Sequence, residues 1–167
     1  LSNANVDILD INANDQAIIG GIIAAADADF TIDSDTTEAQ VNAAINTVKS
    51  LTVNDAIQFN DATVTTVANQ IFNETVEVDA DVTFTANAGT GTVQFVKTLN
   101  SAGGSDDGVA ITGNAVFNDV VGGTAALDFL SISGTSTFNT TAVNTDSSGG
   151  SGDQTYGGDL TLNQNAT

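Results

Sequence analysis

A ten-residue phrase recurs along this chain, and a repeat of this kind constrains the fold more than any other feature. Each copy begins with an apolar residue, carries a second one two positions later, and has a Phe-Asn step eight positions after the first. The clear copies are LTVNDAIQFN from Leu51, VAITGNAVFN from Val109 and LSISGTSTFN from Leu130. An incomplete copy begins at Leu160, and a weaker one ends at Phe72. Such repeats predict stacked supersecondary units.

The pattern from Leu51 onward is that of β-strands. Short runs such as residues 76–78 and 82–84 alternate apolar and polar residues, and glycine-rich breaks separate them. The repeat starts at Val109, Leu130 and Leu160 are 21 and 30 residues apart, which suits coils of roughly 20–30 residues. We therefore expect an all-β protein, a β-solenoid like a parallel β-helix. An antiparallel β-sandwich is the alternative, because the spacing before Val109 is irregular.

The Phe-Asn step has a physical interpretation in a solenoid. Phe at equivalent positions of successive coils would stack in the interior, while Asn at the corner tolerates left-handed backbone and can form a ladder with the next coil. The simpler interpretation is that Phe ends a buried strand and Asn begins a turn. Both make the step structural.

Residues 1–50 differ from the rest of the chain. Residues 36–50 carry a helical pattern and predict one short N-terminal helix, with an apolar face formed by Val41, Ala44, Ile45 and Val48. We therefore divide the chain into an N-terminal segment, residues 1–50, with an apolar strand and this helix, and a β-repeat region, residues 51–167.

Charge and composition exclude several classes of function. The formal net charge is −19, with Lys49 and Lys97 the only cations against 21 carboxylates, so nucleic-acid binding and attraction to anionic membranes are not expected. Residues 17–26 form the longest apolar stretch, too short for the about 20 residues that span a bilayer, so no membrane insertion is expected. The chain lacks Cys and is rich in Asp, Asn and Thr, as is typical of extracellular surface proteins. Because it contains no Met, we expect a processed product or part of a longer protein.

Calcium is the candidate ligand. On a strand, side chains two positions apart share a face, and a row of carboxylates on one face repels itself unless a cation relieves it. Two such rows predict metal ligands: Asp27, Asp29, Asp33 and Asp35, and then Glu77, Asp79 and Asp81. The alternative for each row is a solvated acidic face that prevents edge-to-edge aggregation.

An enzyme is not expected, and we assign no catalytic or organic-cofactor residues. Sugar-binding clefts usually carry Trp or Tyr platforms, but the chain has no Trp and only Tyr156. It also lacks His, the commonest general base.

The apolar segment around Gly20 and Gly21 is a candidate assembly element. A charge-free strand of this kind would aggregate if it were exposed. It is either a buried first strand or a strand added to a neighbouring copy. Its candidate assembly residues are Ile18, Ile19, Ile22 and Ile23.

Residues 120–162 carry a more specific sequence pattern, which consists of a Val-Gly-Gly-Thr step, an Ala-Leu pair, a Leu-x-Ile-x-Gly strand and a Gly-x-Gln-Thr-Tyr-x-Gly turn. The residues of this pattern are Gly122, Gly123, Thr124, Ala126, Leu127, Leu130, Ile132, Gly134, Gly152, Gln154, Thr155, Tyr156 and Gly158. This segment resembles the β-strand repeat arrays of very large bacterial cell-surface proteins, the adhesin-like and haemagglutinin-like proteins. The resemblance departs at residues 146–151, where Ser and Gly are inserted, and it does not extend to residues 1–50. It implies an extracellular, non-enzymatic scaffold.

We therefore expect an extracellular structural subunit that self-assembles into a cell-surface filament, layer or stalk through β contacts between copies of itself. The alternative is an adhesin module that recognises glycan or a host surface.

Overall fold

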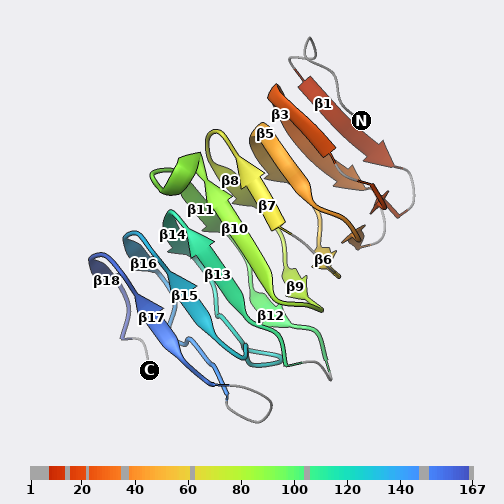
Figure 1. Ribbon diagram of the computed structural model, residues 1–167. Helices are drawn as coiled ribbons and strands as arrows, with labels where there is room; N and C mark the ends of the chain where they lie inside the picture. Colours follow the sequence, from red (N-terminus) through yellow and green to blue (C-terminus); the bar gives the residue numbers. More distant parts are fainter. Residues whose placement is uncertain are drawn as a thin grey trace.

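The structure is a computed structural model that describes residues 8–13, 16–21, 23–34, 38–60, 63–103, 106–146 and 151–165. Its strands stack side by side along one axis, from β1 (Ile8–Ala13) at one end to β17 (Gln154–Tyr156) and β18 (Leu160–Leu162) at the other (Figure 1). Every strand pair among these residues is parallel. The β-solenoid prediction is confirmed, and the antiparallel sandwich is excluded.

The strands form three faces, because each coil consists of two or three short strands joined at corners, and each strand stacks on its counterpart in the next coil. The first face contains β7 (Thr63–Thr66), β10 (Val82–Ala86), β13 (Val109–Thr112), β15 (Leu130–Ile132) and β17. The second contains β8 (Gln70–Phe72), β11 (Thr92–Phe95), β14 (Asn114–Phe117), β16 (Ser136–Phe138) and β18. The third contains β2 (Ile18–Ile19), β4 (Ala39–Val41), β6 (Ile57–Phe59), β9 (Val76–Val78) and β12 (Leu99–Ser101).

Two long strands join the first and second faces. These are β3 (Ile23–Ser34) and β5 (Ile45–Val53), and β5 pairs with β7 through its first half and with β8 through its second. The only helical turn in the described residues is a 3-10 turn, Asn87–Gly89, after β10. The predicted division at residue 50 falls inside β5, so strands on both sides of it share one sheet.

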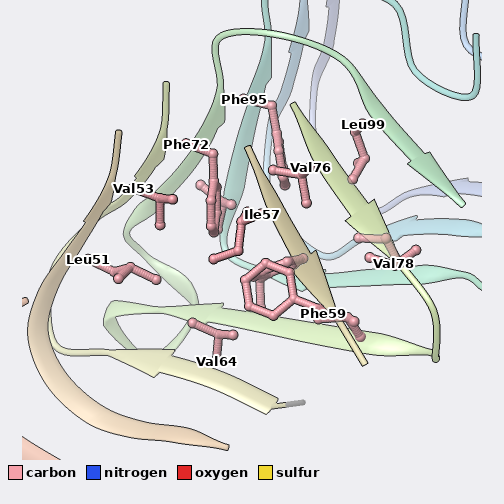
Figure 2. Packing of buried hydrophobic residues seen from close by; sticks show 14 of the residues in the cluster. Leu51, Val53, Ile57, Phe59, Val64, Phe72, Val76, Val78, Phe95 and Leu99 are labelled. Carbon is pink, nitrogen blue, oxygen red and sulfur yellow. The ribbon is translucent and has the colours of Figure 1, made fainter. Parts of the chain in front are cut away.

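Phenylalanines stack in the interior, which is one of the two arrangements that the Phe-Asn step allowed, although Phe95 of this column is followed by Val96. Phe72, Phe95, Phe117 and Phe138 occupy one register position on four successive strands of the second face. Their ring centroids are 5.1, 5.2 and 4.8 Å apart, with interplanar angles of 12°, 3° and 7°. Figure 2 shows Phe72 and Phe95 beside each other within the apolar core. The flat rings follow the strand spacing of about 4.8 Å.

Asparagines form the predicted ladder at the corner that follows this column. The amide of Asn139 donates to Oδ1 of Asn118 at 2.7 Å, and the amide of Asn163 donates to Oδ1 of Asn139 at 2.6 Å. These partners are 21 and 24 residues apart, which gives the coil lengths directly. Asn73 and Asn54 form the same contact nearer the N-terminus, at 2.8 Å.

The repeated phrases are only partly equivalent in space. Val109 pairs with Leu130, and Phe117 with Phe138, so these two copies are in phase. The copy from Leu51 is out of phase, because Leu51 lies on the second face and its Phe59 lies on the third. The copy predicted from Leu160 is also out of phase, since Leu160 pairs with Ser136 and not with Leu130.

The predicted helix over residues 36–50 is wrong. Residues 39–41 and 45–53 are β4 and β5, and Val41, Ile45 and Val48 are buried there. Thr47 has a positive φ of 55°, and β5 changes register at this point. The bulge lets the side chains of Ile45 and Val48, which are three residues apart, both point into the core. This spacing matches the period of a helix.

Candidate functional site

The first acidic row lies on the outer side of β3. Asp27, Asp29 and Asp33 alternate with buried residues, as the period-two pattern predicted. Asp35 lies outside the described residues. Asp29 has protein partners: Nζ of Lys49 lies 2.8 Å from its Oδ2, and the Ser50 hydroxyl donates to its Oδ1. These hydrogen bonds lower the pKa of Asp29, the bond from Lys49 having the larger effect.

The second acidic row does not form a compact group. Glu77 points outward from β9, between buried Val76 and Val78, while Asp79 and Asp81 are exposed beyond the strand end. Oδ1 of Asp81 accepts a hydrogen bond from the backbone N–H of Gly108 at 2.8 Å. This contact gives Asp81 a role in joining adjacent coils.

Glu38, just before β4, was not predicted as part of either row. Partial burial raises its pKa, and the charge of Glu77 raises it further. Across the described ranges, no group of three or more acidic, His or Cys side chains is arranged to hold a metal ion. Calcium binding stays a prediction.

The predicted assembly segment is divided between core and surface. Ile19 and Ile23 are buried in the core cluster, whereas Ile18 is 57% exposed on β2. Ile22 lies outside the described residues. Ile18 and Ile19 pair with Gln40 and Val41 of β4, so this short strand belongs to the third face of its own chain.

A buried glutamine, missed by the sequence analysis, holds the corner between β7 and β8. The amide nitrogen of Gln70 donates to the carbonyl oxygens of Thr85 at 2.9 Å and Val64 at 3.2 Å. Gln70 occupies an interior position and is fully buried. Its contacts satisfy backbone carbonyls where the chain changes face, so its role is structural.

The C-terminal coil exposes the other unpredicted surface. Leu160 and Leu162 continue the interior columns of Ser136 and Phe138, yet they are 45% and 52% exposed. The repeat pattern placed Leu160 at the start of a buried strand. It is exposed because, within the part of the chain described, β18 has a neighbour on one side only, β16. We call Leu160, Leu162 and the strand that carries them the C-terminal edge.

No helix in the described ranges is long and apolar enough to cross a membrane. Comparisons of the chain with protein families, with curated proteins and with solved structures find no match.

Proposed function

We propose that this chain is an extracellular structural subunit that assembles with copies of itself into a cell-surface filament, layer or stalk. The observation that carries the proposal is the parallel ladder of the second face, in which successive coils stack on one another in register.

The regular interior supports a mechanical role. Stacked phenylalanines and the asparagine ladder repeat from coil to coil, so each coil is held mainly by its neighbours. A rod built in this way can lengthen without a new kind of contact. We propose no catalytic role.

Electron microscopy of the negatively stained protein, with millimolar calcium and with chelator, tests the proposal. Ordered fibres or sheets in both conditions support the scaffold without metal, and fibres that dissolve in chelator add calcium as a bridge between acidic rows. Dispersed monomers in both conditions contradict self-assembly. A glycan array on the same preparation then tests the alternative, an adhesin module.

A further inference from the structure

The outer side of the first face carries two columns of small hydroxyl side chains. On β7, β10, β13 and β15, which lie side by side in Figure 1, every second residue is buried, so the residues between them point outward. The strand pairings place one column at Thr63, Thr83, Ala110 and Ser131, and the other at Thr65, Thr85 and Thr112. Ser133 continues the second column, because its backbone N–H donates to the carbonyl oxygen of Ile111 at 2.9 Å. Seven of these eight residues are Thr or Ser, and we call the eight positions the hydroxyl array.

The hydroxyl array has the two periods of a parallel sheet. Neighbours in one column are one strand apart, about 4.8 Å, and the columns are two residues apart along each strand, about 6.6 Å. In ordinary ice each water molecule has four tetrahedral neighbours, and O···O distances of about 2.75 Å then give lattice repeats of about 4.5 Å and about 7.3 Å. With the lattice centred on the array, the four strands depart from it by at most about 0.5 Å along the solenoid and about 0.4 Å across it. The spacing of the array therefore fits a surface of ice.

Charge and side-chain type also favour water as the occupant. The four strands contain no charged residue, although the whole chain carries a net charge of −19. An uncharged surface of hydroxyl groups suits an uncharged occupant that both donates and accepts hydrogen bonds. No aromatic residue lies at the eight positions, so this surface lacks the platforms on which sugar rings stack.

The array is held rigidly before any occupant binds. Thr is stiff at its first side-chain torsion, so its hydroxyl and methyl groups have few positions to lose on binding. The hydroxyl of Ser133 accepts a hydrogen bond from the backbone N–H of Gly113 at 3.1 Å, which fixes this side chain across two coils. Buried residues on the same strands anchor the backbone beneath the array.

We propose that the hydroxyl array binds the ordered water at the surface of ice. Each hydroxyl supplies one weak hydrogen bond, and the hydroxyls act together because one sheet holds them at the lattice spacing. The inference goes beyond the proposed function and does not depend on self-assembly.

Uptake of the protein into slowly growing ice tests the proposal. Ice is grown on a cold finger in a dilute solution of the protein, and the fraction found in the ice is measured by densitometry of stained gels. Thr83→Lys places a strongly hydrated ammonium group in the middle of the array. Thr137→Lys is the matched control, because Thr137 points outward between two buried residues of β16 on the second face. Thr112→Lys, at an exposed position of the array, is an independent second variant.

The natural chain and Thr137→Lys should enter the ice to a similar extent, whereas Thr83→Lys and Thr112→Lys should enter at least about fivefold less. Exclusion of the natural chain from the ice overturns the proposal, as do equal effects of the array and control substitutions. Binding to crystalline chitin without uptake into ice also overturns it and assigns the surface to a polysaccharide. Unchanged circular dichroism and Tm verify that the variants fold.

Discussion

Removing one ring from the phenylalanine column tests how this solenoid is stabilised. Phe95 is fully buried and contacts Phe72 and Phe117 in stacked geometry and Phe84 edge-to-face, at centroid distances of 5.1, 5.2 and 5.7 Å. A buried Phe→Ala change costs about 3–5 kcal/mol, and each aromatic pair adds about 0.5–1.5 kcal/mol beyond buried area. With three ring partners, Phe95→Ala should lower the free energy of unfolding by about 4–5 kcal/mol.

Guanidinium chloride unfolding followed by far-UV circular dichroism measures this loss. Phe95→Leu is the matched control, since it keeps an apolar side chain but removes the ring contacts, and about 1–2 kcal/mol is expected. The reasoning is refuted if Phe95→Ala costs less than about 1 kcal/mol at an unchanged m-value. Equal costs for the Ala and Leu variants would instead assign the effect to the rings alone, with no contribution from the cavity.

Three further predictions concern the corners and the acidic residues. Asn139→Ala removes the ladder residue that both donates and accepts, and should cost about 1–2 kcal/mol in chemical unfolding, whereas Asn163→Ala removes one ladder bond and should cost less. Gly122 has a φ of +66°, and a Cβ there would lie 2.2 Å from a backbone oxygen of the next coil, so Gly122→Ala should cost more than about 2 kcal/mol. Gly103→Ala, whose Cβ meets nothing within 4 Å, should change stability by less than about 0.5 kcal/mol. Burial and a nearby carboxylate raise the pKa of Glu38 above its unfolded value of about 4.5. Protonated Glu38 therefore contributes stability below this unfolded pKa, and this stability is lost as pH rises through the folded pKa. Glu38→Gln should therefore raise Tm relative to the natural chain at pH 7 and lose that advantage below pH 4, and a constant difference across this range would contradict it.

The parallel solenoid could be predicted because its coils repeat the same chemistry at a nearly constant interval. The interval between Val109 and Leu130 is a true coil length, and their strands pair in register. The face of the solenoid on which each copy of the repeat begins could not be predicted in this way. Each coil carries several strands that alternate apolar and polar residues, so an apolar pair followed by Phe fits more than one corner. Phe59 accordingly lies on a different face from Phe117.

The predicted helix failed for a local reason that hydrophobic period alone cannot reveal. A bulge at Thr47 places residues three apart on one side of a strand. The β-branched Val41, Ile45 and Val48 suit a strand better than a helix, and this preference was the available signal. The exposure of Leu162 could not be predicted for another reason. Its sequence resembles that of a buried strand, and it is exposed because no described strand lies beyond β18.

We expect the charge of the chain to set the salt dependence of the proposed assembly. Two solenoids of net charge −19 placed side by side would bring carboxylates together along their whole length. Screening of these charges acts over about 8 Å at physiological ionic strength, so the repulsion between neighbouring copies is strongest at low salt. Lateral sheets should therefore require high salt or divalent cations that bridge the acidic rows, and sheets that form equally well at low salt without such cations would contradict this expectation.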